Sequence, residues 1–242
     1  MKAKSFLIAA VLLFGARVWA QEPAQAEPPK AESSISSATP VVRFVFDWKP
    51  QNPPRYSVAV DSTGRATYHS EPSPDLNGGS APEPYQVEWT VSEETRTKIF
   101  DDARKLNYFE GNFEAKAKVA QTGVKTLTYR DPTHDHSTTY NYSENPSIRE
   151  VTQIFQSMAT AAEAGRKLTH DLRYDKLGID RDLKSLQESQ KGGFAMELGS
   201  VVPILQQIAE DPAVMRMSQQ RARQILAAGG FGTSGTAKAS RP

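Results

Sequence analysis

The chain of 242 residues contains no cysteine. This absence excludes disulfide bonds, thiolate metal sites, cysteine nucleophiles and attachment of a lipid to an N-terminal cysteine. Long hydrophobic runs are missing too. One apolar stretch, residues 6–15, stands out, and it is far shorter than the roughly 20 residues that a membrane-spanning helix needs. We therefore expect no membrane span once this stretch has been removed.

A strong excess of charge of either sign is also missing, because 29 Lys and Arg face 28 Asp and Glu. Without Lys2, Lys4 and Arg17 the rest of the chain carries 26 basic and 28 acidic residues, a net charge of −2. Binding to nucleic acid through charge needs a strongly basic face. Adhesion to an anionic membrane by charge alone has the same need. The sequence predicts neither kind of partner.

The first 20 residues have the layout of a secretory signal peptide. A basic start is followed by the apolar run, and Val18-Trp19-Ala20 supplies small residues at positions −3 and −1. We expect cleavage after Ala20, with Ala24-Gln25-Ala26 as a second possible site. The alternative is a membrane anchor, which the short run and Arg17 disfavour. The pattern predicts export to a periplasmic or extracellular space.

Composition divides the remainder into four parts. Residues 21–40 are rich in Pro, Ala, Glu, Ser and Gln, which predicts a disordered linker. Residues 41–145 carry strand patterns, and residues 146–228 carry helical ones. Residues 229–242 are rich in Gly, which predicts a disordered tail.

The strand-rich part shows period-two alternation of apolar and polar residues, typical of half-buried strands. The first such run begins at Val41, and Asp61-Ser62-Thr63-Gly64 predicts a tight turn between two later ones. Ser92, followed by Glu93 and Glu94, predicts the start of one helix within this part. The expected fold class is α+β: a largely antiparallel sheet with one inserted helix, followed by an all-helical C-terminal region.

The helical part begins at Asn145-Pro146, a cap followed by Pro in the first turn. We expect a long amphipathic helix that ends near Tyr174, then a short helix capped by Asp180. Further helices are expected over residues 200–210 and from Asp211-Pro212 to about residue 228. Hinges at Gly178 or at Gly192-Gly193 leave open whether this region packs on the sheet.

Thr133-His134-Asp135-His136 is the cluster most capable of binding a metal. Two His at positions i and i+2 of a strand face the same side, which gives half of a zinc site. His69 or Glu83 could complete it. The alternative is a solvated hairpin tip, where these residue types are common. No cofactor is otherwise expected.

Three further groups of residues have a functional and a structural interpretation. His170 beside Asp171 is either a general base or a helix-terminal His that interacts with the helix dipole. Basic residues of the last helix form either a site for an acidic partner or a solvated face. Aromatic residues of the early strands line a groove for a peptide or sugar, or pack in the core. The basic and aromatic residues are Arg216, Arg221 and Arg223, and Trp48, Tyr56, Tyr85 and Trp89.

Residues 55–130, about a third of the chain, resemble small secreted bacterial β-rich domains of unknown function. The elements that carry the resemblance are the strand at residues 56–60, the helix start at residues 89–94, the segment Leu106-Asn107-Tyr108-Phe109 and the strand at residues 126–129. The same stretch is similar, more weakly, to a family of proteinaceous inhibitors of bacterial metalloproteases. That second resemblance implies an inhibitory role.

These observations give three functional hypotheses. The first is an exported non-enzymatic domain that binds or scaffolds a protein or a cell-envelope component. The second is a metal-dependent secreted hydrolase that uses the loop with His134 and His136. The third is an inhibitor of an extracellular protease.

Overall fold

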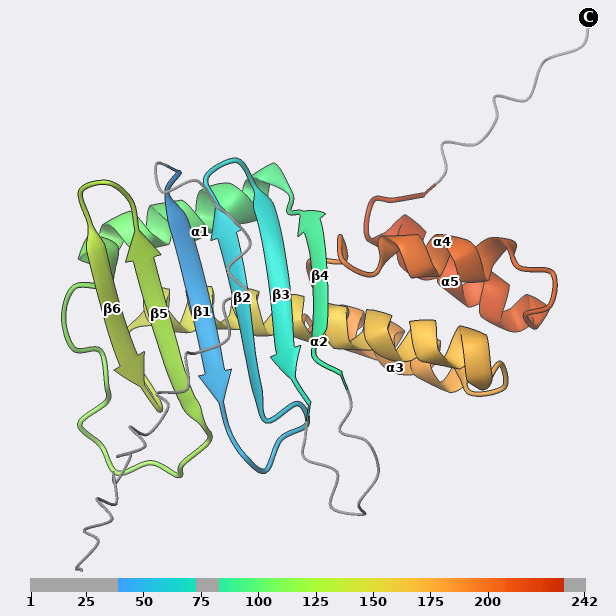
Figure 1. Ribbon diagram of the computed structural model, residues 1–242, viewed down its shortest axis with the longest axis horizontal. Helices are drawn as coiled ribbons and strands as arrows, with labels where there is room; N and C mark the ends of the chain where they lie inside the picture. Colours follow the sequence, from blue (N-terminus) through green and yellow to red (C-terminus); the bar gives the residue numbers. More distant parts are fainter. Residues whose placement is uncertain (1–38, 73–82, 233–242) are drawn as a thin grey trace, which may run out of the picture. The chain divides into compact units, whose positions relative to one another are not determined.

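The fold is described from a computed structural model, over residues 39–72 and 83–232. The predicted signal peptide, most of the predicted linker and the end of the predicted tail lie outside the described residues. Within them, six strands form one antiparallel sheet in the order β4-β3-β2-β1-β5-β6 (Figure 1). The strands are β1 (Val41–Asp47), β2 (Arg55–Asp61), β3 (Arg65–Glu71), β4 (Tyr85–Thr90), β5 (Val124–Arg130) and β6 (Asp135–Tyr140).

Alternation along the strands buries one face of the sheet. In β1, Val42, Phe44 and Phe46 are buried, and their neighbours in the sequence point to the other face. The predicted turn between β2 and β3 forms as expected. Asp61 Oδ1 accepts hydrogen bonds from the backbone N–H groups of Thr63 (2.9 Å) and Arg65 (3.0 Å), and Gly64 takes a φ of +90°.

The inserted helix α1 (Glu93–Lys105) begins where the sequence predicts, because Ser92 caps it and accepts a hydrogen bond from Thr95 N. A short 3₁₀ helix, η1 (Asn107–Phe109), follows.

In the hairpin between β5 and β6, the predicted loop extended to His136. The observed β6 begins at Asp135, because Asp131 already closes the turn by accepting the N–H groups of Thr133 and His134.

The long helix α2 (Pro146–Tyr174) has the predicted length and the predicted cap at Asn145. Its first half packs on the sheet through Val151, Phe155 and Met158, and the ring of Phe155 stacks on Phe44 with centroids 5.6 Å apart. Its second half, with Leu168, belongs to a second core. One helix therefore takes part in both cores, and it continues past the β4 edge of the sheet (Figure 1).

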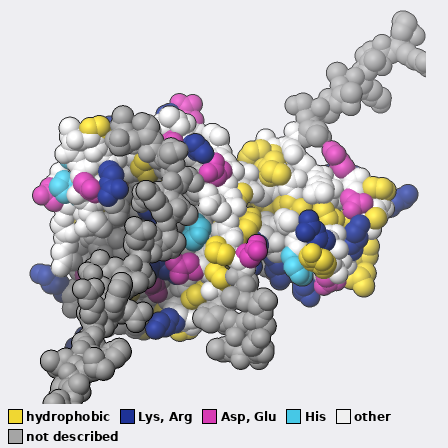
Figure 2. All heavy atoms as spheres, viewed as in Figure 1, with side chains coloured by type: hydrophobic (Ala, Val, Ile, Leu, Met, Phe, Trp, Pro, Cys, Tyr) yellow, Lys and Arg dark blue, Asp and Glu magenta, His cyan; other side chains and the backbone are white. Residues whose placement is uncertain are grey.

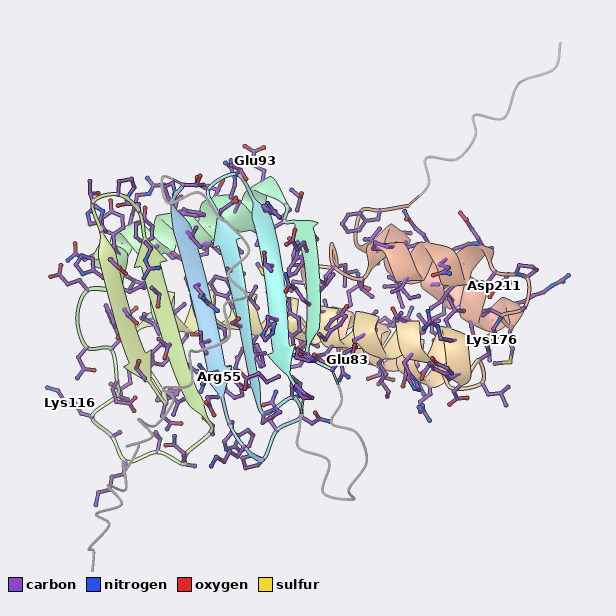
Figure 3. All side chains as sticks on the ribbon, in the orientation of Figure 1. Arg55, Glu83, Glu93, Lys116, Lys176 and Asp211 are labelled. Atoms are coloured by element: carbon purple, nitrogen blue, oxygen red, sulfur yellow. The ribbon has the colours of Figure 1, made fainter. Side chains whose placement is uncertain are left out.

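The second core is formed by α2 with α3 (Ile179–Lys191), α4 (Val202–Glu210) and α5 (Arg216–Ala228). The prediction that the last helix starts at Asp211-Pro212 is wrong, since α5 starts at Arg216. Residues 211–215 form a turn in which Asp211 Oδ1 accepts the N–H of Ala213 (2.8 Å). Lys176 and Asp211, at one end of this region in Figure 3, form an ion pair of 3.0 Å that joins the two loops at that end.

The segment between α3 and α4 returns from the helical core to the sheet core. Met196 N donates to Ser157 Oγ on α2 (2.6 Å), and Ser92 N donates to Glu197 Oε2 (3.2 Å). At Gly199 a Cβ atom would lie 2.5 Å from Cδ1 of Trp89, so only glycine fits there. The helical region thus contacts the sheet, which the sequence left open. The α+β fold class, with an antiparallel sheet, an inserted helix and C-terminal helices, is confirmed.

No helix in the described ranges is long and apolar enough to span a membrane.

Candidate ligand-binding groove

An open cavity of about 540 Å³ lies along α2 at the end of the sheet where β5 starts and β6 ends. We call it the α2 groove. Its lining residues are Phe46, Gln51, Thr122, Lys125, Tyr140, Asn141, Tyr142, Ser143, Arg149, Thr152, Gln153, Gln156, Ser157, Thr160 and Phe194. Most of these side chains are amides, hydroxyls or aromatic rings. None of the described residues in this lining is Asp or Glu.

Two periodicities bring these side chains together. On α2, the lining residues from Arg149 to Thr160 recur every three or four positions, so they lie along one face of the helix. In the sheet, Lys125 pairs with Phe46 on one side and with Tyr140 on the other, so all three point toward the buried face. The groove therefore lies where the end of the sheet meets the first turns of α2.

Lys125 is the most unusual residue of the groove because it is a cation at a core position, with 8% of its surface exposed. Its Nζ donates to the carbonyl oxygens of Asn141 (2.8 Å) and Gly123 (3.2 Å) and lies 5.5 Å from the centre of the Phe46 ring. Burial lowers the pKa of Lys125, and the nearby carboxylate of Glu114 acts in the opposite direction. No ion pair joins Lys125 to an acid within the described chain.

Tyr140 forms the inner wall of the groove and is held as a neutral phenol. Its hydroxyl and that of Thr152 are 2.5 Å apart, and Thr152 in turn donates to the Ile148 carbonyl (2.6 Å). Burial raises the pKa of Tyr140 to about 12. Near pH 7 this wall therefore offers a fixed, uncharged hydrogen-bonding surface.

One lining residue of the groove, Phe194, comes from the helical region. Phe194, with 66% of its surface exposed, follows the pair Gly192 and Gly193 at the end of α3. Its N–H donates to Ser189 O (2.8 Å), and the bond from Met196 to Ser157 ties the segment to α2. The groove is thus complete only when the helical region is in place.

The structure places His134 and His136 side by side at the opposite end of β6, with ring centroids 6.0 Å apart. His134 stacks on Tyr108 (4.0 Å), and its Nδ1 lies 3.1 Å from Asp131 Oδ1. Burial opposes ionisation of Asp131, but hydrogen bonds from Thr133 and His134 outweigh it and hold the pKa of Asp131 well below its usual range. Asp131 is therefore a carboxylate that fixes the hairpin turn.

The suggested third ligands do not join this pair. His69 lies on β3, which three strands separate from β6. It points to the open face of the sheet, whereas His136 points to the buried one. In the part of the chain that the structure describes, no three His, Cys, Asp or Glu side chains are grouped so that they could hold a metal ion. The metal site at His134 and His136 stays a prediction.

His170 lies at the exposed end of α2, with Nδ1 3.3 Å from Asp171 Oδ1. Asp171 is buried and faces a second buried carboxyl, Asp182 on α3. Burial and the hydrogen bond to Asp182 raise the pKa of Asp171. Burial acts against ionisation of Asp182 too, but hydrogen bonds from Asp171, Lys167 and Arg181 lower its pKa to about 2. We therefore expect the two acids to share one proton, which would join α2 to α3.

The aromatic residues of the early strands belong mainly to the core. Tyr56 and Trp89 are buried, and Trp48 and Tyr85 pack against the same cluster.

Two of the three basic residues of α5 form hydrogen bonds within the fold. Arg221 donates to Asp180 (3.2 Å), and Arg223 donates to the carbonyl of Ala209.

The helical region also exposes large apolar side chains beside basic ones (Figure 2). The exposed ones on its loops and helix ends include Tyr174, Leu177, Met215 and Met217. Nothing in the described structure indicates what would cover them, so we place the candidate site in the α2 groove.

Sequence reasoning missed the α2 groove. Lys125 carried a usable signal, because alternation puts it on the same face as Leu127 and Tyr129, where a cation is unexpected. No sequence signal indicated that Phe194 lines the groove, since local patterns do not specify contacts between residues far apart in the sequence.

Compared with known proteins, the chain matches no family model and no curated protein sequence.

Proposed function

We propose that this protein is an exported, non-catalytic binding protein whose ligand lies in the α2 groove. The observation that carries the proposal is the groove itself, where amide and hydroxyl side chains converge beside the aromatic rings of Tyr142 and Phe194. Amides and hydroxyls both donate and accept hydrogen bonds, as sugars and peptides do. The ligand we propose is therefore a polar component of the cell envelope or a segment of an envelope protein.

The ionisable groups of the groove support binding in preference to catalysis. The lining holds two basic side chains, Lys125 and Arg149, and Tyr140, which with a pKa of about 12 is a neutral phenol near pH 7. Such groups orient and attract a ligand, whereas acid–base catalysis depends on a group that titrates near the working pH.

Export is supported by the signal-peptide pattern of the first 20 residues. N-terminal sequencing of the protein recovered from the exported fraction checks it. We expect the mature chain to begin at Gln21, and a chain that still begins at Met1 would contradict export by this route.

The other two hypotheses stay predictions. A metal-dependent hydrolase at His134 and His136 requires further ligands, and in the described ranges none joins the pair. A protease inhibitor depends on the resemblance of residues 55–130 alone.

The binding function is tested by calorimetric titration of the mature chain with a fixed panel of probes. The panel holds cellotetraose, chitotetraose, tetragalacturonate, its neutral methyl ester, trialanine, triglutamate and glucose 6-phosphate. We expect at least one probe to bind and to be recovered intact. Absence of binding by every probe, or cleavage of a bound probe, would contradict the proposal.

Two tryptophan variants locate the binding. Thr160 and Thr169 are both exposed on α2, and each donates its hydroxyl to the carbonyl four residues earlier (2.9 and 2.8 Å). Only Thr160 lines the groove. We expect Thr160→Trp to abolish binding and Thr169→Trp to preserve it. Equal binding by both variants would place the ligand elsewhere.

A further inference from the structure

The two cations of the α2 groove have no acidic partner. Across the described residues, neither Lys125 nor Arg149 forms an ion pair, although 16 such pairs occur elsewhere. The acid whose charge acts on Lys125 is Glu114, whose Oε2 accepts the N–H of Asn141 (2.5 Å). Two basic side chains therefore line a polar cavity in which none of the described lining residues is acidic.

Burial strengthens the attraction of this positive charge for an anion, because water and salt screen it less. Lys125 has lost most of its water, and its partners are carbonyl and hydroxyl oxygens and the Phe46 ring. Burying an ion without a counter-charge carries a large desolvation cost. An anion bound in the groove would offset part of that cost. It would also be screened less by salt than an anion on an open surface.

Arg149 supplies the complementary group at the mouth of the groove. It is exposed in the first turns of α2, where no acidic residue occupies the first turn to compensate the positive end of the helix dipole. A guanidinium binds an oxyanion through two parallel N–H donors. The amide side chains of Gln153 and Gln156 lie one and two turns further along the same face.

We infer that the ligand of the α2 groove carries an oxyanion beside neutral hydroxyl or amide groups. This inference rests on the proposed function. The positive charge of Lys125 attracts the oxyanion, and Arg149 binds the oxyanion directly. The amides and hydroxyls along α2 bind the neutral hydroxyl or amide groups of the ligand. A carboxylated sugar, a carboxylated peptide and a sugar phosphate share this chemistry.

The same panel of probes tests the inference, since it contains acidic and neutral members. We expect tetragalacturonate, triglutamate or glucose 6-phosphate to bind at least about ten-fold more tightly than the neutral probes, because charged hydrogen bonds exceed neutral ones in strength. Which of the three binds identifies the source of the oxyanion. We expect affinity to fall as salt is raised.

Arg149→Gln is the diagnostic variant, with Arg173→Gln as its control at the other exposed end of α2. We expect about a ten-fold loss of affinity for the acidic probe in the first variant and none in the second. Tight binding of neutral probes that is unchanged by Arg149→Gln would overturn the inference and leave the binding function standing. Absence of binding by every probe would overturn both. Because Arg149 is exposed, its substitution tests the charge without disturbing the core.

Discussion

The helical core and the α2 groove both bury charged side chains, but they balance the charge differently. In the helical core Asp171 lies beside Asp182, and Lys167 (2.7 Å) and Arg181 (3.1 Å) pair with Asp182. In the α2 groove Lys125 is buried with carbonyl and hydroxyl oxygens and the Phe46 ring as its partners, and without an ion pair. Charge that is balanced within the fold contributes to structure, whereas charge left unbalanced beside a cavity is available to a ligand.

The two cores share α2, so we expect them to unfold together. Phe155→Ala tests this expectation most severely, because Phe155 is fully buried on α2 and stacks on Phe44. Removing the ring should cost about 3–5 kcal/mol of unfolding free energy. Trp48 and Trp89 lie in the sheet region, so tryptophan fluorescence reports the sheet and far-ultraviolet circular dichroism reports mainly the helices.

We expect both signals of Phe155→Ala to shift by the same amount in urea. A shift in fluorescence alone would show that the helical core unfolds independently. Phe194→Ala serves as the control, since that ring is exposed and its loss should change stability little.

The contact between the cores is tested next by Gly199→Ala. The added methyl group would lie 2.5 Å from Cδ1 of Trp89 and 3.1 Å from Thr90 O, so β4 or the segment before α4 must shift. We expect a loss of about 1–3 kcal/mol, measured by urea unfolding. Gly165 lies within α2, and a Cβ atom there would make an ordinary 3.5 Å contact with Val201. Gly165→Ala should therefore be neutral or stabilising. Equal effects of the two changes would contradict the close packing at Gly199.

Ser157→Ala should have a smaller effect, concentrated at the groove wall. Ser157 is buried, and its hydroxyl accepts the N–H of Met196 at 2.6 Å. Its loss leaves that donor unpaired and should cost about 1–2 kcal/mol. Hydrogen exchange should speed up at residues 194–196. Thr160→Ala, which removes an exposed hydroxyl bonded within its own helix, should leave exchange there unchanged.

The proton that we expect Asp171 and Asp182 to share predicts how stability depends on pH. The pKa of Asp171 is raised in the fold, so its contribution is present at low pH and is lost as pH rises above about 4. The pKa of Asp182 is lowered to about 2, so its contribution is present above about 4 and is lost as pH falls toward 2. The other titratable groups near the pair are His170, Asp175, Lys167 and Arg181.

Asp171→Asn should replace the shared proton with an amide N–H and remove the loss of stability above pH 4. The expected gain at pH 7 is about 1 kcal/mol or less. Melting temperatures measured from pH 3 to pH 7 check this, and Asp182→Asn should instead weaken the loss below pH 4. Unchanged pH profiles in both variants would contradict a shared proton.

The sequence predicted those features that depend on local patterns. Alternation identified the strand-rich part, and the capping residues Ser92 and Asn145 marked the starts of α1 and α2. Asp211-Pro212 was misleading, because Asp211 bonds to Ala213 and forms a turn before the helix begins. The α2 groove could not be predicted in full. It needs the register that pairs Lys125 with Tyr140 and the return of Phe194 from the helical region, and both depend on contacts distant in sequence.

The central claim is that both cores build one site for an oxyanion-bearing ligand. Nuclear magnetic resonance of the ¹⁵N-labelled mature chain, titrated with tetragalacturonate, triglutamate and glucose 6-phosphate in turn, tests it most directly. For the probe that binds, we predict the largest shift changes at Lys125, at Arg149 and in residues 194–196. Changes centred on His134 and His136 or on the open face of the sheet, or none with any of the three probes, would contradict the claim.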